Sequence, residues 1–366
     1  MAPQNTQALS GHTITTDSEG LKFAEFYQLQ CEKSRDSAEN PQISNKEAKE
    51  PAQQAPAADK KAAMDPPGTF PDPLVVPPLS EYRQSFIILH GRGSTAEKFA
   101  SPLLEMASAS GDKLQTAFPH AKIIFLTASR NRAIIYKRSY THQWFDHWHM
   151  EEPSKRQDLM RDGLHKSCEY VHRILQQEIE VVGKGNVVLW GLSQGCATSL
   201  TSLLTWNGQP FAATVGMCGY LPFANHIEEI AKGNNSKTGD DLFGQEGDDA
   251  DPFSHSDDEG GDSDMSLPND SNKKSLPGQA IKFLREEIDL DDKPQMVFQG
   301  VPVFLGHGVE DEKVPIELGR EAKTCLDLLG ADVEMIEYDG LGHWYSKEML
   351  GDIFDFLRGK LEVGDA

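Results

Sequence analysis

One serine between two glycines is the first feature of this sequence that could do chemistry. Ser193 is the centre of a Gly-x-Ser-x-Gly pentad, with Gly191 before it and Gly195 after it. The chain has 31 glycines, so such a pentad arises easily by chance, and a structural turn serine is the alternative. However, the apolar run 186–191 precedes the pentad and a helical pattern over 194–206 follows it. Because a nucleophile elbow consists of a strand, a turn and a helix, we predict that Ser193 is a nucleophile.

A serine hydroxyl is a weak nucleophile by itself, so Ser193 needs a base and an acid that orients the base. Asp311 lies in "HGVEDEKVP" and His343 in "YDGLGHW", each a few residues past an apolar run. Catalytic groups of a doubly wound sheet gather at the carboxyl ends of its strands. We therefore predict that His343 is the base and Asp311 the acid, in the chain order that suits such an elbow.

Other polar residues compete for these two roles. Glu310 and Glu312 flank the predicted acid, and Asp339 lies close to the predicted base. A carboxylate in a loop is most often solvated and without a chemical role, so we expect all three at the surface. His307 stands at the end of its own apolar run, nearer the sheet than a base should be. We interpret it as a hydrogen-bonded structural histidine.

Acyl chemistry at Ser193 also requires an oxyanion hole, in which two backbone N–H groups face the oxygen that gains negative charge. One N–H comes from the residue after the nucleophile, which is Gln194. The second is expected from a loop after an early strand, and the glycine-rich stretch "ILHGRGST" at 88–95 follows such a run. By itself this stretch is only a turn, but together with the other groups it predicts Arg92 as the second donor.

Three histidines offer a metal site as the alternative chemistry. His142, His147 and His149 lie within the stretch "THQWFDHWH". The stretch has no carboxylate or thiol at a convincing ligand spacing, and it lacks the i, i+4 pair that places two histidines on one helix face. We therefore predict no metal, and the predicted serine chemistry needs no organic cofactor.

The elements that must position these residues follow from the apolar pattern. Short apolar runs predict buried strands at 85–91, 122–127, 186–191, 213–219, 301–308 and 333–338. Amphipathic stretches predict helices at 95–109, 156–180, 194–206, 226–232, 279–288, 316–330 and 346–358. Continuous apolar strands that alternate with helices are typical of a parallel sheet covered on both faces. We therefore predict an α/β fold with a mostly parallel, doubly wound sheet.

Composition divides the chain into one folded domain and two tails. Residues 38–73 are rich in Pro, Ala, Gln and Lys and poor in large apolar groups, so they cannot offset the entropy of ordering. Aromatic and apolar residues cluster over 21–30, where a short docking helix is the alternative to plain disorder. We predict a mostly disordered arm over 1–73, one domain over 74–361 and a tail over 362–366.

An acidic segment interrupts the predicted domain. Residues 234–277 contain few apolar residues, and residues 240–264 alone carry eleven acidic side chains with no Lys or Arg. Because such a segment cannot build a core, we predict a disordered surface insertion, with a docking site for a protein partner as the alternative. Ser254 and Ser256 each have an acid three residues on, which suits phosphorylation by an acid-directed kinase.

The overall composition restricts the partners and the compartment. The chain has 57 acidic against 35 basic residues and a net charge of −22, which disfavours nucleic acid as a general partner. Its five cysteines are scattered without a CxxC pair, so we expect neither a disulfide framework nor a zinc knuckle. The sequence shows no secretory pattern and no run near the roughly 18 apolar residues of a membrane span. We expect a protein of the cytoplasm, or of the cytoplasm and nucleus, with at most transient contact with a membrane surface.

In combination, the motifs resemble those of one enzyme family. The stretches "LHGRGS", "QWFD", "GLSQGCA", "CGYLP", "HGVEDEKVP" and "YDGLGHW" are similar to those of the acyl-protein thioesterases and carboxylesterases, the phospholipase/carboxylesterase family of α/β-hydrolases. The resemblance covers about residues 74–361 apart from the acidic segment. It implies a serine hydrolase that cleaves acyl thioesters, including fatty acyl groups on protein cysteines, and acyl oxygen esters, including lysophospholipids.

The resemblance implies the same nucleophile, acid, base and oxyanion donors as above, and it adds an acyl site. Trp144 and Phe145 in "QWFD" and Leu221 in "CGYLP" match family positions near that site, which implies that they line an apolar channel. Better-known thioesterases have "HGLGD" and "GFSQGG" where this chain has "HGRGS" and "GLSQGC". The change to Arg92 keeps the backbone donor but makes the mouth of the pocket more basic. It therefore bears on depalmitoylating specificity more than on hydrolase chemistry.

Three functions follow from these observations. The first is an acyl-protein thioesterase, which would act on an acylated protein and remove palmitoyl groups. The second is a general short-chain carboxylesterase or lysophospholipase, which would act on a small acyl ester. The third belongs to another class, an interaction module in which the acidic insertion binds a protein partner and the hydrolase core serves as scaffold.

Overall fold

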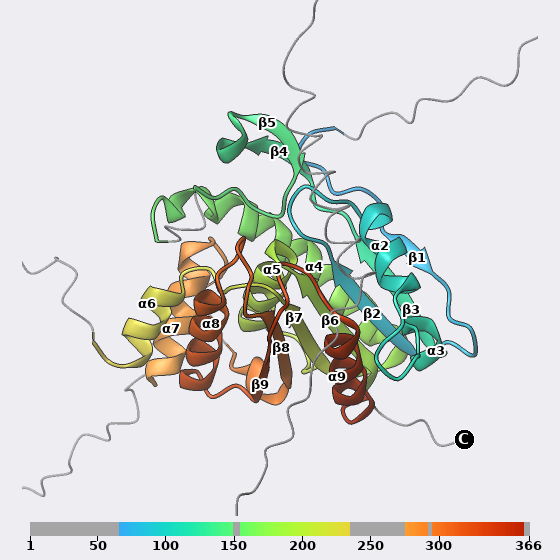
Figure 1. Cartoon of the computed structure of the whole chain (residues 1–366). Coiled ribbons are helices and arrows are strands. Elements are labelled where there is room, and N and C mark those ends of the chain that lie inside the picture. Colours follow the sequence, from blue (N-terminus) through green and yellow to red (C-terminus); the bar gives the residue numbers. More distant parts are fainter. Residues whose placement is uncertain (1–65, 149–153, 235–274, 292–294, 362–366) are drawn as a thin grey trace, which may run out of the picture.

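The computed structural model describes the chain in four stretches, 66–148, 154–234, 275–291 and 295–361. The predictions of a disordered arm and a docking helix before residue 66, of a disordered acidic insertion over 235–274 and of a C-terminal tail concern residues outside these stretches. The predicted end of the insertion at residue 277 is wrong, because residues 276 and 277 begin a helix. Within the described stretches, the chain folds into a seven-stranded sheet with helices on both faces and a separate two-stranded hairpin (Figure 1).

The central sheet has the strand order β1-β3-β2-β6-β7-β8-β9. In the described stretches, β1 pairs antiparallel with β3 and every other neighbouring pair of this sheet is parallel. The strands are β1 (Leu74–Val76), β2 (Gln84–Leu89), β3 (Ala121–Leu126), β6 (Val187–Leu192), β7 (Ala213–Met217), β8 (Val303–Gly308) and β9 (Val333–Tyr338). This arrangement confirms the predicted mostly parallel sheet, and each strand expected from an apolar run is present within two residues of its expected ends.

Helices follow the strands as the amphipathic pattern predicts, although the first of them ends at Glu105 and not at the expected residue 109. They are α2 (Ala96–Glu105), α3 (Leu114–Ala117), α4 (Arg161–Val182), α5 (Gln194–Leu204), α6 (Ala224–Ala231), α7 (Leu276–Glu287), α8 (Ile316–Leu328) and α9 (Lys347–Arg358). The helix α4 begins later than residue 156, the expected start, because Gln157–Leu159 form a 3-10 turn. The single-turn helix α3 is too short to produce an amphipathic repeat, so the sequence does not predict it.

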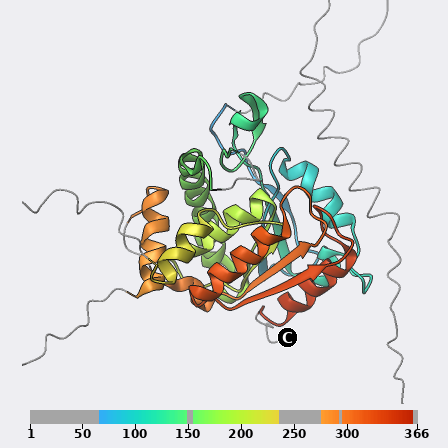
Figure 2. The same cartoon turned by 60° about the vertical axis from the view of Figure 1, so that its left-hand side comes forward.

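Alternate residues of the central strands face opposite sides of the sheet. In β2, Ile87 and Leu89 belong to a core that α4 to α8 cover, whereas Phe86 and Ile88 belong to a second core that α2, α3 and α9 cover (Figures 1 and 2). Burial on both faces explains why the strands are apolar without alternation in the sequence. The sheet is thus a buried middle layer whose strand ends support the loops of the site.

A short hairpin departs from the predicted pattern. The strands β4 (Arg130–Ala133) and β5 (Ser139–His142) pair antiparallel and project from the body of the molecule at the top of Figure 1. Both are short and polar, so no apolar run marks them in the sequence. Before β1, the ring of Phe70 stacks on Tyr170 with centroids 4.4 Å apart. Residues that the sequence assigns to the arm therefore pack against the domain.

The acidic segment lies between α6 and α7 in the chain. Phe283 of α7 contacts Phe223 edge-on, with ring centroids 6.4 Å apart, and stacks on His226 of α6 at 5.5 Å. The chain leaves the described fold after Asn234 and returns at Ser275. Packing within the fold itself therefore holds the two helices from which the segment departs.

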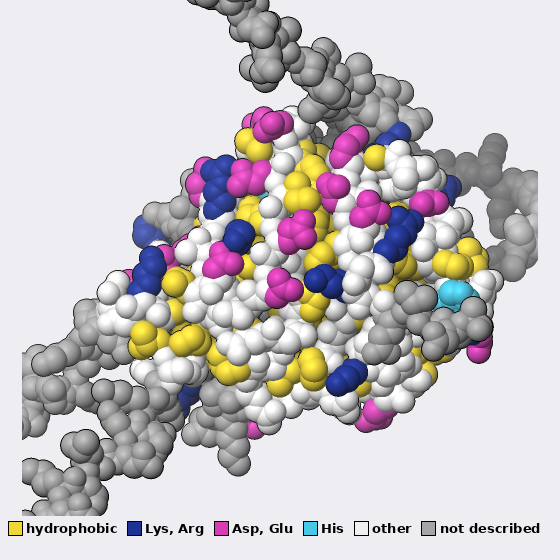
Figure 3. All heavy atoms as spheres, turned by 90° about the horizontal axis from the view of Figure 1, so that it is seen from below, with side chains coloured by type: hydrophobic (Ala, Val, Ile, Leu, Met, Phe, Trp, Pro, Cys, Tyr) yellow, Lys and Arg dark blue, Asp and Glu magenta, His cyan; other side chains and the backbone are white. Residues whose placement is uncertain are grey.

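The surface remote from the hairpin mixes both signs of charge. Seen from below, Lys and Arg side chains alternate with Asp and Glu side chains and small apolar areas, without a field of one sign (Figure 3). The excess of acidic residues in the chain is therefore not gathered on this face. None of the described helices combines the length and the hydropathy that crossing a membrane requires.

Candidate active site

Ser193 occupies a sharp turn between β6 and α5. Its φ of 57° and ψ of −120° lie where residues other than glycine are rarely found. A Cβ atom on Gly191 would lie 2.3 Å from the backbone of Gly195, and one on Gly195 would lie 2.4 Å from the carbonyl oxygen of Leu89. Both glycines of the pentad are therefore required by space, as predicted, and they let the turn pack directly against the end of β2.

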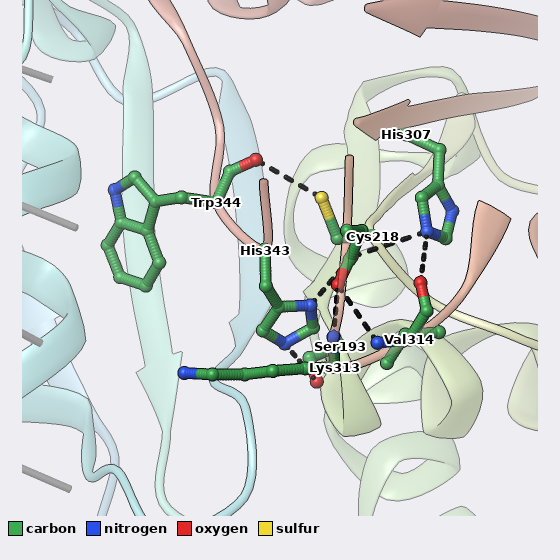
Figure 4. Close-up of polar contacts among 8 residues, drawn as sticks. Ser193, Cys218, His307, Lys313, Val314, His343 and Trp344 are labelled. Atoms are coloured by element: carbon green, nitrogen blue, oxygen red, sulfur yellow. Dashed lines mark hydrogen bonds and ion pairs between the residues drawn. The ribbon is translucent and has the colours of Figure 1, made fainter. Parts of the chain in front are cut away.

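Three loops bring Ser193, His343 and Asp311 together. They follow β6, β9 and β8, at the carboxyl ends of parallel strands. The hydroxyl Oγ of Ser193 lies 2.9 Å from Nε2 of His343 (Figure 4). Nδ1 of His343 lies 2.7 Å from Oδ2 of Asp311. With the serine O–H donating to Nε2 and the Nδ1–H donating to the carboxylate, the three side chains form one line of hydrogen bonds. A hydroxyl in such a line can pass its proton to the imidazole.

The carboxylate of Asp311 is buried and well supplied with donors. Its Oδ1 accepts the backbone N–H groups of Lys313 and Val314, both at 2.9 Å, and its Oδ2 lies 3.3 Å from Nε2 of His307. Burial alone would raise the pKa of Asp311, but hydrogen bonds from His307, His343 and the backbone outweigh it and hold this pKa well below the ordinary carboxyl value. Asp311 is therefore ionised at neutral pH and can accept the Nδ1–H of His343.

The competing acids lie at the surface and the competing histidine supports the acid. Glu310, Glu312 and Asp339 are exposed. His307 is buried and donates its Nε2–H to a backbone carbonyl of the loop after β8 at 2.9 Å, which confirms the hydrogen bond predicted for it. Because the same nitrogen faces Asp311, His307 also helps to fix the carboxylate, a contact that its place in the sequence did not indicate.

The two predicted oxyanion donors flank Ser193. The N–H of Gln194 is in the first turn of α5, where helical N–H groups lack a partner, and within the described stretches neither it nor the N–H of Arg92 donates to another group. The loop that carries Arg92 comes close, since a Cβ on Gly91 would lie 3.3 Å from Cβ of Ser193. The N–H of Ser193 itself donates to the carbonyl of Met217 at 2.8 Å. Two unused N–H groups thus lie where the sequence predicts them, and their role stays a prediction.

The side chain of Gln194 ties the elbow to a neighbouring loop. Its Oε1 accepts the backbone N–H of Trp144 at 3.0 Å, and its Nε2 donates to the carbonyl of Phe145 at 2.7 Å. Trp144 in turn donates its indole N–H to the carbonyl of His90 at 2.8 Å. From the sequence, only a backbone role is predicted for Gln194. In the structure its amide also connects the nucleophile elbow, the Trp144 loop and the glycine-rich loop into one hydrogen-bonded unit.

The three residues assigned to the acyl channel are buried. Trp144, Phe145 and Leu221 are each at most 3% exposed and belong to the core on the α4 and α5 side of the sheet. A Cβ on Gly163 would lie 2.5 Å from Cα of Phe145, so α4 packs tightly against this loop. Trp144 and Phe145 lie directly beside the elbow through their bonds to Gln194, and the acyl channel itself stays a prediction.

The histidine-rich stretch is engaged in other contacts. His142 donates through Nδ1 to the carbonyl of Ala128 at 2.8 Å, and His147 contacts the guanidinium of Arg92. His149 lies outside the described stretches. Within these stretches, His, Cys, Asp and Glu side chains form no group of three that could hold a metal ion.

Two cysteines pack behind the elbow. A Cβ on Gly216 would lie 2.6 Å from Sγ of Cys196, and one on Gly219 would lie 2.4 Å from it. These glycines make room for Cys196, and the small residues of "TVGMCG" are the sequence signal for this packing. The thiol of Cys218 donates to the carbonyl of Trp344 at 3.1 Å, which supports the loop of the predicted base (Figure 4).

Comparison with known proteins identifies the family. The sequence matches the phospholipase/carboxylesterase family over residues 71–247 and 283–361. Acyl-protein thioesterase 1 of Gibberella zeae is 26% identical over 293 residues, which cover 79% of this chain and 95% of that protein. Acyl-protein thioesterase 1 of Debaryomyces hansenii is 23% identical over 283 residues, which cover 75% of this chain and 90% of that protein.

A solved structure shows the same fold. Acyl-protein thioesterase 2 of Zea mays matches with a TM-score of 0.52 at 19% sequence identity, over 79% of this chain and 99% of that chain. The two segments of the family match lie on either side of residues 248–282, in the region of the acidic insertion. The match therefore covers both halves of the sheet and every loop of the site. The chain belongs to the phospholipase/carboxylesterase family of α/β-hydrolases and is a serine hydrolase.

Proposed function

We propose that this hydrolase cleaves acyl thioesters and acyl esters through a Ser193-His343-Asp311 triad and an acyl-enzyme intermediate. The line of hydrogen bonds from the hydroxyl to the carboxylate, 2.9 Å and 2.7 Å long, is the observation that carries the proposal. The strained backbone of Ser193 adds support, because strain of this kind persists where the surrounding structure enforces it and is common at active sites.

The proposed cycle uses only groups of the chain and water. His343, oriented by Asp311, takes the proton of Ser193 while the hydroxyl oxygen attacks the acyl carbonyl. The N–H groups of Arg92 and Gln194 donate to the oxyanion of the tetrahedral intermediate. The imidazolium then gives its proton to the departing thiol or alcohol. Water repeats the attack on the acyl-enzyme, the acid product leaves and Ser193 is restored.

We further propose acylated proteins as substrates, so that the reaction is protein depalmitoylation. The relatives at 23–26% identity are acyl-protein thioesterases, which supports this substrate class. A small acyl ester or a lysophospholipid is the second candidate. The basic Arg92 at the site favours this second candidate, because the better-known thioesterases have leucine at that position. The third candidate, an interaction module, would leave this site without a role.

We also propose a reducing location, in the cytoplasm or in the cytoplasm and nucleus. The cysteines of the described stretches are free and buried. Burial raises the pKa of Cys168 to about 11 and that of Cys196 to about 12, so both thiols are unreactive at neutral pH. Imaging of the full-length protein with a fluorescent tag tests the location, and an exclusively extracellular signal would contradict it.

Replacing the nucleophile tests the mechanism. In the full-length protein, Ser193→Ala is expected to lower kcat for a p-nitrophenyl acyl ester by at least about 10⁴-fold and to abolish labelling by a fluorophosphonate. Ser199→Ala is the matched control, since Ser199 lies in the same helix and its buried hydroxyl has no hydrogen-bond partner in the described stretches. Labelling of Ser193→Ala at the wild-type rate would refute the triad.

A comparison of substrates tests the substrate class. Hydrolysis rates are measured on p-nitrophenyl esters of increasing chain length and on a peptide that carries S-palmitoyl cysteine. A thioesterase is expected to remove palmitate from the peptide and to prefer long acyl chains. A strong preference for acetyl or butyryl esters without depalmitoylation would instead show a short-chain carboxylesterase.

A further inference from the structure

The guanidinium of Arg92 has no carboxylate partner in the described stretches. The side chain is half-buried, its Nη1 lies 2.7 Å from a ring nitrogen of His147, and its guanidinium lies over the ring of Tyr136 at 5.2 Å from the centroid. These are its only contacts with polar or aromatic groups of the described chain. A half-buried positive charge without a counter-ion is unusual, above all in a chain with a net charge of −22.

The acid on which the charge of this guanidinium acts is already engaged. The charge of Arg92 acts on Asp146, but the Asp146 carboxylate accepts the backbone N–H of His147 at 3.0 Å and that of Ile134 at 3.2 Å. It forms no ion pair with Arg92. The contacts with His147 and Tyr136 therefore fix the direction of the guanidinium while leaving donors that a carboxylate or phosphate could engage.

A second unpaired donor lies in the loop after β7. Tyr220 is 3% exposed, and its hydroxyl has no hydrogen-bond partner in the described part of the chain. A buried hydroxyl without a partner costs free energy and calls for an explanation. Burial raises the pKa of Tyr220, and the attraction of Arg92 does not offset this effect, so the phenol is neutral at pH 7 and can donate.

Arg92 and Tyr220 each come directly after a glycine that packs against Ser193. Arg92 follows Gly91, where a Cβ would lie 3.3 Å from Cβ of Ser193, and Tyr220 follows Gly219, where a Cβ would lie 3.1 Å from the carbonyl oxygen of Ser193. The ring of Phe145 connects the two sides, because its centroid is 6.3 Å from that of Tyr220 and 6.3 Å from that of His147, the partner of Arg92. The guanidinium of Arg92, which has no carboxylate partner, and the buried hydroxyl of Tyr220, which has no hydrogen-bond partner, thus belong to the two loops that touch Ser193.

We propose that Arg92 and Tyr220 form a subsite beside Ser193 that binds a negatively charged group of the substrate, a carboxylate or a phosphate. The guanidinium supplies a charge-assisted hydrogen bond and the phenol supplies a second donor. The anionic group belongs either to the acyl chain or to the leaving group, and both sources offer the same chemistry. The proposal rests on the proposed function, since it names the kind of ester that Ser193 attacks.

Two matched pairs of substrates separate the sources. For the acyl chain, kcat/KM of the full-length protein is compared for p-nitrophenyl hydrogen glutarate, which is anionic, and its neutral methyl ester. For the leaving group, the butyryl thioester of coenzyme A is compared with that of N-acetylcysteamine. In at least one pair the anionic member is expected to be preferred by about tenfold or more, as for hydrogen bonds to charged groups.

Variants assign the preference to the subsite. Arg92→Leu is expected to lower the anionic-to-neutral ratio of kcat/KM by about tenfold or more, and Tyr220→Phe, which preserves shape, by about two- to tenfold. Arg92→Lys keeps the charge and should retain part of the ratio. Arg320→Leu is the control for net charge, because Arg320 is exposed and pairs with the exposed Glu337. In this variant the ratio should stay unchanged.

The outcomes distinguish this proposal from the proposed function. A ratio near one in both pairs, or a ratio that neither Arg92→Leu nor Tyr220→Phe changes, overturns the subsite, while fluorophosphonate labelling of Ser193 keeps the triad. If none of the four substrates is hydrolysed and the fluorophosphonate does not label Ser193, the triad is contradicted. Calorimetry then tests the subsite without hydrolysis. The hydrogen glutarate ester and butyryl coenzyme A are each titrated into Ser193→Ala and into the double variant that also carries Arg92→Leu, and the two affinities are compared. Equal affinity of both proteins for each compound would overturn it.

Discussion

Asp311 acts through the hydrogen bond that it accepts from His343. Its Oδ2 takes the Nδ1–H at 2.7 Å, which leaves Nε2 without a proton and facing Ser193. In Asp311→Asn, an amide N–H can face Nδ1 and favour the opposite tautomer, in which Nε2 cannot accept a proton. We expect kcat for a p-nitrophenyl ester to fall by about 10³- to 10⁴-fold.

The neighbouring acid provides the control for this variant. Glu310 is exposed and precedes Asp311 in the same loop, so Glu310→Gln removes a charge without touching the line of hydrogen bonds. Steady-state rates of both variants are compared with the wild type. Equal losses in the two variants would show that loop charge, rather than the position of the carboxylate, supports the reaction.

The lowered pKa of Asp311 also predicts how stability depends on pH. The hydrogen bonds of the folded state hold this pKa below the ordinary carboxyl value, so ionised Asp311 stabilises the fold above about pH 4. As the pH falls below that value, the unfolded chain takes up the proton first and the contribution is lost. The difference in unfolding free energy between wild type and Asp311→Asn should therefore be largest near neutral pH and shrink below pH 4. Urea titrations at several pH values measure it, and a difference that grows in acid would contradict the assignment.

At the residue scale, the sequence predicted the groups that local motifs mark. Ser193 and His343 stand in glycine-rich turns after apolar runs, which is why their positions could be predicted. The orphaned hydroxyl of Tyr220 could not be predicted, because it depends on which loops meet in three dimensions. The same holds for His307, whose contact with the acid requires the chain to turn back after β8.

The nucleophile elbow is the element whose packing leaves least room. A Cβ on Gly195 would meet backbone atoms of Leu89 and His90 at 2.4–2.7 Å, and backbone cannot move aside as a side chain can. We expect Gly195→Ala to lower the free energy of unfolding by about 2–4 kcal/mol and to lower kcat as well, because α5 and Ser193 must shift. Urea unfolding and esterase rates measure the two effects.

A glycine with space around it serves as the control. In α9, a Cβ on Gly351 would have its nearest contact at 3.8 Å, with Ala109. Gly351→Ala is expected to stabilise the protein by up to about 1 kcal/mol, since alanine favours the helix. If Gly195→Ala were as stable as the wild type, the close packing of the elbow against β2 would be wrong.

The predictability of each element depends on how it is buried. Strands such as β6 and β8 are covered on both faces, so continuous apolar runs mark them in the sequence. The hairpin of β4 and β5 projects from the body and is polar, so it has no such mark, although it carries the carbonyl of His142 that accepts the N–H of Gly93 at 2.8 Å. The sequence therefore predicted the layer that supports the site more completely than the loops around it.

For the whole molecule, the match to the phospholipase/carboxylesterase family leaves out residues 248–282, in the region of the acidic segment. The helices α6 and α7, from which the segment departs, pack through Phe283, Phe223 and His226. None of these residues contacts Ser193, Asp311 or His343 in the described structure. The catalytic and the acidic parts of the chain are therefore separable in principle, and a deletion can test this.

Replacing residues 240–264 with a short Gly-Ser linker removes eleven negative charges and leaves a net charge of −11. Because the contacts of α6 with α7 remain, we expect kcat/KM for a neutral ester to stay within about twofold and the unfolding free energy within about 0.5 kcal/mol of wild type, as for other surface changes. The control exchanges the acids of 240–264 for Asn and Gln and keeps the length, which separates charge from chain length. If activity is kept but a protein that co-purifies with the wild type is lost from both variants, the segment is a docking site. A collapse of neutral-ester hydrolysis in the deletion would instead show that the segment supports the catalytic fold.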